Sequence, residues 1–396
     1  MENGADPAQG AAGAHVLQIQ KGDEGYEMTA AKIIKERDAN LDLLRIVSML
    51  LIVFLHSIDH SGVLETAETA SKAMYFYVRF TYALCQVCVN CYVLISGYYL
   101  VRAKVRLYKL AVLWMETVFY TLLFKVLFMA LGIVPFSLFS VVSCFFPILT
   151  GRYWFLTIYV GMYLVFPFLN LLVSAMDRRQ HALLNLCLFG LFSMWSSIHP
   201  AIAGMNSGGG WGLAWFAVLY LTAAWFRLYY TPSGKPTVAF AVFFLIPFLM
   251  AAAQLVVRTA GIGVLQTILE NWFKYNSAPV YLMTLSLFTA FLNVRIKSAK
   301  ASHCICAAAP LTLGVYLIHA HANVSPWLWE TLALPEKMGS TGFPVIQICC
   351  VIGIFAASLV LDAIRKYTLG RLERSSPVMA LCDRIKDATD KLASCI

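Results

Sequence analysis

Charged side chains are scarce in this chain. Only 13% of its 396 residues are Asp, Glu, Lys or Arg, whereas a soluble domain carries about 25%. Apolar residues make up 60% of the sequence, and the mean hydropathy is +0.71. This composition excludes an ordinary soluble enzyme and predicts a protein that crosses a membrane several times.

Several motifs of soluble enzymes are also missing. The sequence contains no Gly-rich nucleotide loop, no His-Glu-x-x-His, no Gly-x-Ser-x-Gly and no tandem Cys-x2-Cys zinc pattern. The net charge of +9 comes from basic residues scattered between apolar segments rather than gathered in one stripe. We therefore expect no nucleic-acid partner and no metal centre.

The first residues lack the apolar core of a cleavable signal peptide. Residues 1–30 are polar and rich in Gly and Ala. Residues 29–37 (TAAKIIKER) form either a short amphipathic helix on the inner membrane surface or part of a solvated leader. We expect residues 1–38 to be a disordered or interfacial tail, and residues 364–396 to be a cytoplasmic basic amphipathic tail.

Ten apolar segments are long enough to cross about 30 Å of hydrocarbon. They cover residues 41–60, 74–100, 107–131, 153–176, 181–199, 211–230, 236–256, 275–293, 305–323 and 343–362. Residues 133–150 are apolar but short and interrupted by proline, so we expect a re-entrant or interfacial segment, with an eleventh crossing as the alternative. The predicted fold is an all-α membrane bundle of about ten transmembrane helices in residues 39–363.

The positive charges support this topology. With a cytoplasmic N-terminus, twenty-two of the 30 Lys and Arg residues fall on the cytoplasmic side, five on the other side and three within spans. Because Lys and Arg accumulate on the cytoplasmic side of membrane proteins, the asymmetry favours an even number of spans. We expect both termini to be cytoplasmic.

The first span carries two ionisable residues on one face. Eleven steps of about 100° bring His56 to within roughly 20° of the face of Arg45, about 16 Å further along the helix. Such groups are costly in a membrane and usually face a wet cavity or the bundle interior. His56 is therefore a candidate general base, which Asp59 at i+3 would orient through a hydrogen bond. The alternative is a core histidine bonded to a backbone carbonyl.

Four cations follow the second span, and two further candidates lie in the ninth. Arg102 and Arg106 share one face if their segment is helical, and a cluster of this kind fits a ligand with several phosphates, such as a coenzyme A ester. The alternative is plain anchoring on the cytoplasmic side. The four cations are Arg102, Lys104, Arg106 and Lys109.

In the ninth span, Tyr316 and His319 point together, and His319 either shares a cavity with His56 or packs in the core.

Three other groups of residues call for an interpretation. Cys85, Cys88 and Cys91 have a spacing used by iron–sulfur clusters, but they lie inside an apolar span without a usable fourth ligand, so helix packing is the better interpretation. Residues 206–210 (NSGGG) are expected to be a flexible connector. The second and third spans also hold isolated charges, some of which must pair or line a polar cavity: Arg79, Glu116 and Lys125.

Four elements in order resemble the integral-membrane acyltransferase family 3 of bacteria, whose members O-acetylate cell-surface polysaccharides. They span roughly residues 40 to 362. They are residues 40–45 (NLDLLR) running into 53–56 (VFLH), residues 94–98 (LISGY) followed by basic residues, residues 153–156 (YWFL) with 163–167 (YLVFP), and residues 314–319 (GVYLIH).

The resemblance implies transfer of an acyl group, usually acetyl, from cytoplasmic acetyl-CoA to a sugar hydroxyl in a bacterial cytoplasmic (plasma) membrane. It implies that His56 is catalytic, as a direct base or through an acetyl-histidine, and that Arg45 is its essential partner. Tyr316 or His319 would stabilise the oxyanion. The basic segment would contact acyl-CoA, although the family's frequent Arg-x-x-Arg is here Arg102-x-x-Val105 and Arg106-x-x-Lys109.

Two alternatives remain at this stage. Ten spans with buried charges also fit a transporter or flippase for a polar glycan or glycolipid, although no inverted repeat is evident. A membrane sensor or subunit without catalysis is the third interpretation. The expected partners are acyl-CoA, a carbohydrate or glycolipid acceptor and the lipid bilayer, and a homo-oligomer is compatible with the sequence.

Overall fold

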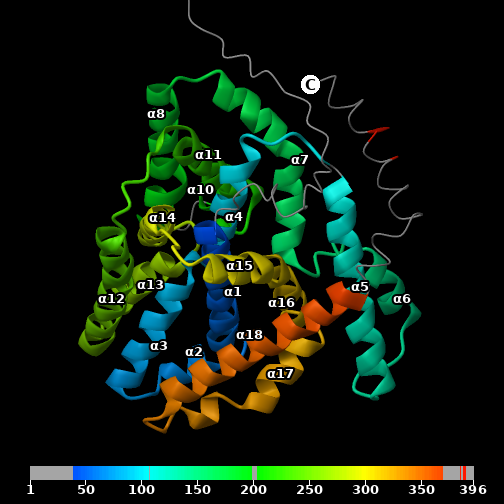
Figure 1. The fold of residues 1–396 in the computed structure, drawn as a ribbon. Helices are drawn as coiled ribbons and strands as arrows, with labels where there is room; N and C mark the ends of the chain where they lie inside the picture. The colour runs from blue at the N-terminus through cyan, green and yellow to red at the C-terminus, as the bar shows by residue number, and fades with distance from the viewer. Residues whose placement is uncertain (1–38, 107, 199–202, 369–383, 385–386, 389–396) are drawn as a thin grey trace, which may run out of the picture. The chain divides into compact units, whose positions relative to one another are not determined.

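The computed structural model describes the chain except residues 1–38, 107, 199–202, 369–383, 385–386 and 389–396 (Figure 1). In the residues it describes, every regular element is a helix, which confirms the predicted all-α class. The predicted N-terminal tail lies outside the described residues. The predicted C-terminal tail also lies largely outside them, but its first residues continue the last helix, α18, which ends at Thr368.

Eight helical segments of the described chain are long and apolar enough to cross a membrane. They are α1 (Ala39–Asp59), α3 (Lys72–Cys85) with α4 (Val87–Leu100), α5 (Tyr108–Ala130), α7 (Trp154–Ser174), α8 (Arg178–Phe189) through η3 (Gly190–Met194) and α9 (Trp195–Ile198), α12 (Thr237–Ala260), α15 (Ala299–Ala308) through η5 (Ala309–Leu311) and α16 (Thr312–His319), and α18 (Phe343–Thr368).

Two further predicted spans form shorter helices. Helix α11 (Leu213–Tyr229) has 17 residues and α14 (Ala278–Asn293) has 16. All ten predicted segments are thus helical in the described part of the chain, and eight meet the length and hydropathy expected of a crossing. The number of crossings and the side of each terminus stay predictions.

The segment 133–150 contains only two very short helices, α6 (Leu138–Val142) and η2 (Ser143–Phe145). It is tied to α5, because the indole of Trp114 donates to the carbonyl of Phe145 and the hydroxyl of Thr121 donates to that of Cys144, both at 2.9 Å. No helix long enough for an eleventh crossing forms here. The other connecting helices are α2 (Val63–Ala67), α10 (Ala203–Gly210), α13 (Gly263–Glu270) with η4 (Asn271–Phe273), and α17 (Val324–Leu332) with η6 (Pro335–Lys337).

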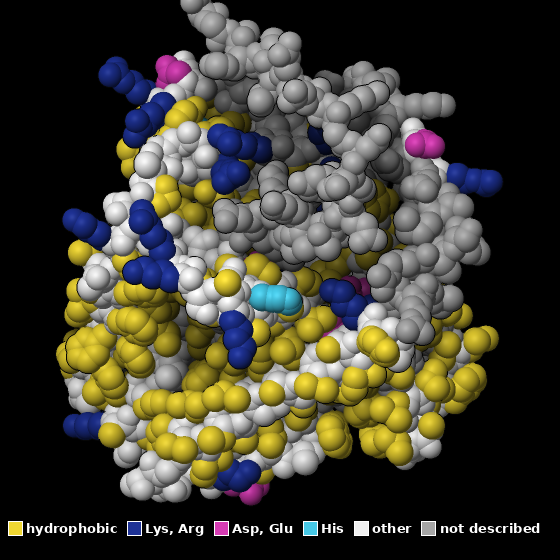
Figure 2. All heavy atoms as spheres, in the orientation of Figure 1, with side chains coloured by type: hydrophobic (Ala, Val, Ile, Leu, Met, Phe, Trp, Pro, Cys, Tyr) yellow, Lys and Arg dark blue, Asp and Glu magenta, His cyan; other side chains and the backbone are white. Residues whose placement is uncertain are grey.

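The outward faces of several long helices are hydrophobic. Figure 2 shows hydrophobic side chains along α18 and over the region of α12. Large apolar side chains exposed over such an area are typical of a surface that lies against lipid. On α12 and α18 they include Val238, Phe244, Leu245, Phe248, Leu249, Val345, Ile352, Val360, Leu361 and Ile364.

Helix α1 lies among seven other α-helices, α2, α3, α4, α14, α15, α16 and α18. Both of its ends are fixed by hydrogen bonds. The amide of Asn40 donates to the carbonyl of Phe291 in α14 at 2.9 Å, and the amide of Gln347 in α18 donates to the hydroxyl of Ser57 at 3.0 Å. A helix surrounded in this way holds its side chains in fixed positions, which is what a site built on α1 requires.

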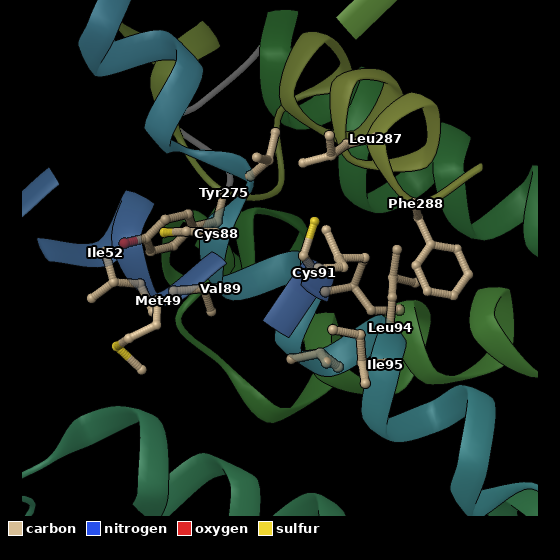
Figure 3. Close-up of a cluster of buried hydrophobic side chains, with 14 of the residues drawn as sticks. Met49, Ile52, Cys88, Val89, Cys91, Leu94, Ile95, Tyr275, Leu287 and Phe288 are labelled. Atoms are coloured by element: carbon tan, nitrogen blue, oxygen red, sulfur yellow. The ribbon is translucent and has the colours of Figure 1, made fainter. Parts of the chain in front are cut away.

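The main hydrophobic cluster joins α1, α4 and α14. Figure 3 shows Met49 of α1 beside Cys88 and Cys91 of α4, with Leu287 of α14 nearby. Cys88 and Cys91 are fully buried among these apolar side chains. The cysteines therefore act as small packing residues, as their position in an apolar span indicates.

A second cluster surrounds the C-terminal end of α1. It brings together Ile58 of α1, Val63 of α2, Tyr75 of α3, Trp329 of α17 and Phe343 of α18. The short helices α2 and α17 thus close this end of the bundle, one turn beyond His56.

Two of the isolated charges pair with residues of opposite charge. Arg79 contacts Glu68 at 2.6 Å and Glu270 at 2.9 Å, and both carboxylates are partly exposed. Glu116 of α5 contacts Arg365 of α18 at 2.9 Å, and Arg365 also binds Asp362 at 2.7 Å. Both buried arginines thus have carboxylate partners, which offsets the cost of burying them.

Gly314 allows α16 to lie against the fully buried Asp362 of α18. A Cβ atom at Gly314 would lie 2.2 Å from Cγ of Asp362. Asp362 also accepts a hydrogen bond from the hydroxyl of Tyr120 at 2.7 Å, so its carboxylate cannot move away without breaking that contact. This close approach fixes α16 between α5 and α18.

We expect Gly314→Ala to destabilise the protein by about 1–3 kcal/mol, because the added methyl group must displace a bonded carboxylate. The measurement is the thermal unfolding midpoint in detergent. Gly353→Ala in α18 is the matched control, since no atom lies within 4 Å of its Cβ position. Equal midpoints for the two variants would contradict the proposed packing.

Candidate active site

His56 and His319 lie side by side at the centre of the candidate site. Nδ1 of His56 in α1 is 3.0 Å from Nε2 of His319 in α16, and the ring centroids are 5.0 Å apart. His319 is fully buried and His56 is partly buried. The structure therefore joins two histidines separated by 263 residues, and His319 shares the site of His56.

The hydrogen bonds determine which nitrogen carries each proton. Nδ1 of His319 lies 2.6 Å from the carbonyl oxygen of Val315, which can only accept, so this nitrogen is protonated. In neutral His319 the other nitrogen, Nε2, is then an acceptor, and Nδ1–H of His56 donates to it. Nε2 of His56 is left as the unprotonated nitrogen, with the lone pair that a base or nucleophile needs.

The end of α16 explains this orientation. His319 is the last residue of the helix, and its ring folds back onto the carbonyl of the preceding turn. The carbonyls of the last turn lack helical partners, and one of them, that of Leu317, accepts from the hydroxyl of Tyr153 at 2.8 Å. The residue before α7 thus helps to fix the helix end that carries His319.

A third histidine stacks on the opposite side of His56. The ring of His60 lies 4.2 Å from that of His56 with an angle of 15° between the planes, and its Nδ1 is 3.3 Å from the hydroxyl of Ser325. Burial lowers the pKa of His60, which lies just beyond α1, although Asp59 opposes the shift. At neutral pH His60 therefore packs against His56 as an uncharged ring.

Asp59 does not hold the place predicted for it. Asp59 was expected to orient His56 through a hydrogen bond, but Nδ1 of His56 bonds His319, and Asp59 lies exposed at the end of α1. The reason is geometric: Asp59 is the last helical residue, one turn beyond His56, whereas α16 places a nitrogen directly opposite the imidazole.

Tyr316 lies beside the histidine pair. Its ring is 6.3 Å from that of His319, and it packs against Tyr153 at 5.5 Å and Phe155 at 6.2 Å. The predicted common direction of Tyr316 and His319 thus agrees with the structure, and Tyr316 also faces residues at the start of α7.

Arg45 lies nearer the other end of α1. It forms an ion pair with Asp42 at 2.7 Å, and its backbone carbonyl accepts from the hydroxyl of Tyr92 in α4 at 3.1 Å. About a quarter of its side chain, 24%, remains exposed. Arg45 therefore does not touch His56 in this structure, and the helix separates the two by about 16 Å.

The basic segment is an irregular connection rather than a helix. Residues 103–106 have no helical structure, so the condition for Arg102 and Arg106 to share a helix face is not met. Arg102, Lys104, Arg106 and Lys109 are all exposed.

Helix α7 anchors this connection through two side chains that sequence analysis did not identify. The hydroxyl of Tyr163 accepts from the backbone N–H of Arg106 and donates to its carbonyl, both at 3.2 Å. The amide of Asn170 donates to the carbonyl of Leu100 at 3.2 Å. In the sequence, the only sign of this role is that both residues are polar within an apolar span. Their partners could not be inferred, because they are more than fifty residues away.

Comparison with known proteins identifies one relationship. A family model described as an acyltransferase domain matches residues 38–363, most of the chain. No curated protein and no solved structure matches the sequence. The match covers the helices that hold both histidines and the basic connection. The chain therefore belongs to acyltransferase family 3 and is a membrane acyltransferase.

Proposed function

We propose that the protein transfers an acetyl or similar short acyl group from acyl-CoA to a hydroxyl of a cell-surface polysaccharide or glycolipid precursor in a bacterial plasma membrane. The observation that carries this proposal is the bonded histidine pair, because it leaves Nε2 of His56 with a free lone pair. A transporter needs no such base, and membership of the acyltransferase family favours acyl transfer over transport.

The lone pair of His56 serves either of two routes. In direct transfer, Nε2 takes the proton of the acceptor hydroxyl while its oxygen attacks the thioester carbon; the C–S bond then breaks, and the CoA thiolate recovers a proton from His56. In the two-step route, Nε2 itself attacks the thioester carbon, the C–S bond breaks and the CoA thiolate leaves an acetyl-histidine; the acceptor hydroxyl then attacks this acetyl group, the C–N bond breaks, and the hydroxyl proton passes to the thiolate, directly or through His56. Both routes develop positive charge on His56, and the hydrogen bond to His319 strengthens as that charge forms.

The exposed cations fit the donor side of the reaction. Arg102, Lys104 and Arg106 stand on a connection whose backbone is held by α7, and CoA carries several phosphates that such cations bind. Arg45 lies on α1 between this basic end and His56, with part of its guanidinium exposed. In this arrangement the phosphates stay near the predicted cytoplasmic surface, while the thioester reaches His56. Tyr316 would then donate to the oxyanion, because both ring nitrogens of His319 are already engaged by Val315 and His56.

We expect His56→Ala to lower acetyl transfer from labelled acetyl-CoA at least about a hundredfold, as is typical for the loss of a general base. Membrane insertion and acetyl-CoA binding should be retained. His303→Ala is the matched control, because His303 is an exposed histidine on α15. Unchanged turnover in His56→Ala would end the assignment of this residue.

His319 is a positioning residue in this proposal, and its replacements should differ from each other. In His319→Gln the amide oxygen still accepts the Nδ1 proton of His56, whereas His319→Leu removes the acceptor. We expect the Leu variant to have the lower kcat by about tenfold or more, which corresponds to one lost hydrogen bond of a buried group. The Leu variant should also have a shifted pH–rate profile, while the KM for acetyl-CoA stays the same. Identical losses in both variants would indicate a merely structural role.

Reversing charge in the basic connection should weaken binding of the donor. For Arg102→Glu combined with Arg106→Glu, we expect the KM for acetyl-CoA to rise about 10–100-fold, because two charge-assisted hydrogen bonds are replaced by repulsion. The control is Lys300→Glu, an exposed lysine that lies on the same predicted side at the start of α15. A similar rise in both proteins would show a general charge effect and argue against phosphate binding at this connection.

A further inference from the structure

Three aromatic rings lie together at the start of α7. The indoles of Trp154 and Trp211 are stacked, with centroids 4.5 Å apart and planes 21° from parallel. The ring of Tyr275 lies beside both, at 6.1 Å from Trp154 and 6.0 Å from Trp211. Tyr275 is buried, but Trp211 is 50% exposed. We call these three residues the aromatic platform. One of its indoles therefore remains half open to the surroundings.

An unusual backbone turn holds Trp211 in place. Ser207, Gly208, Gly209 and Gly210 all have positive φ, of 47°, 63°, 74° and 94°. A Cβ atom at Gly210 would lie 2.7 Å from Cβ of Tyr275, so only glycine lets the turn rest on the platform. The expected flexible connector is thus a defined left-handed turn, and the strain at Ser207 is the kind that clusters at functional sites.

A continuous series of ring contacts connects the platform with the histidine pair. Trp154 lies 6.1 Å from Phe155, Phe155 lies 6.2 Å from Tyr316, and Tyr316 lies 6.3 Å from His319. His319 in turn bonds His56. Packed aromatic side chains therefore link the platform to the residue that bonds the proposed base.

Polar groups accompany the same path. The phenol of Tyr275 lies within electrostatic reach of the carboxylate of Asp59 and the phenol of Tyr82. Asp59 is exposed at the end of α1, one turn from His56. Flat apolar rings beside a carboxylate and phenols match the two-sided chemistry of a pyranose, which has an apolar face of C–H groups and an edge of hydroxyls.

We propose that the aromatic platform is the subsite that binds a neutral sugar ring of the acyl acceptor. The apolar face of the sugar lies on the exposed side of Trp211, and its hydroxyls turn toward Asp59 and Tyr275. This inference rests on the proposed function and adds a substrate class and an entry side to it. Asp59, which does not orient His56, thereby gains a role as a hydrogen-bond acceptor for the acceptor sugar.

The topology agrees with this assignment. Trp154 begins α7, Trp211 precedes α11 and Tyr275 precedes α14, all at helix ends predicted to lie on the outer side, whereas the basic connection is predicted to be cytoplasmic. The donor and acceptor subsites are then on opposite predicted sides of the membrane. Trp side chains also anchor proteins at membrane interfaces, and that alternative is an outcome of the test.

The test measures saturation-transfer NMR of three neutral trisaccharides, cellotriose, chitotriose and maltotriose, with the full chain in detergent. Sorbitol, a polyol without a ring, is the negative probe. We expect binding of at least one trisaccharide, with the strongest saturation on its C–H face. Trp211→Ala should weaken that binding about tenfold, near the upper limit of one aromatic contact. Gly210→Ala should also weaken trisaccharide binding, because the added methyl group displaces the turn that holds Trp211.

Trp327→Ala is the matched control, because Trp327 is a 48% exposed tryptophan on α17 that packs edge-to-face against Phe128 instead. Its affinity for the trisaccharide should equal that of the unaltered protein. The proposal fails if no trisaccharide binds, if sorbitol binds equally well, or if Trp211→Ala and Trp327→Ala change only the thermal midpoint, as interfacial anchors would. Hydrolysis of acetyl-CoA by the unaltered protein reports the proposed function separately.

Discussion

The hydrogen bond between His319 and His56 is the interaction on which the chemistry of this protein depends. A buried imidazole with no partner can place its proton on either nitrogen, and only one of the two forms offers a lone pair toward a substrate. The carbonyl of Val315 removes this freedom, because it forces a proton onto Nδ1 of His319 and thereby onto Nδ1 of His56. A backbone group, which cannot be replaced by mutation, thus sets the protonation of the proposed base.

The position of His319 depends in turn on how α16 is held. Gly314 lies one residue before Val315 and rests directly on Asp362, which also binds Arg365 and the hydroxyl of Tyr120. Buried ion pairs add little net stability, since desolvation offsets most of their attraction, but their geometry is strict. Asp362 and Arg365 therefore act mainly by fixing position: they hold the turn of α16 that carries Val315 and His319 relative to α5 and α18.

The sequence predicts the local features of this arrangement and fails where distant segments meet. Hydrophobicity identifies the ten helices, and the helical period places Arg45 and His56 on one face. The period cannot show that His319, 263 residues away, bonds Nδ1 of His56. The same limit applies to the basic connection: Arg102 and Arg106 would share a face only in a helix, and residues 103–106 are not helical.

Glycine-rich residues 206–210 show a second limit. Glycine is compatible with flexibility and with a single left-handed conformation, and composition alone does not distinguish the two. The neighbouring chain supplies the missing information: Tyr275 and Asn276 lie so close to Gly210 that no side chain fits there. The consequence is functional, because a turn that moved would leave Trp211 free to rotate away from Trp154. A rigid aromatic face binds with less loss of conformational entropy than a mobile one, so the constraint at Gly210 favours recognition at Trp211.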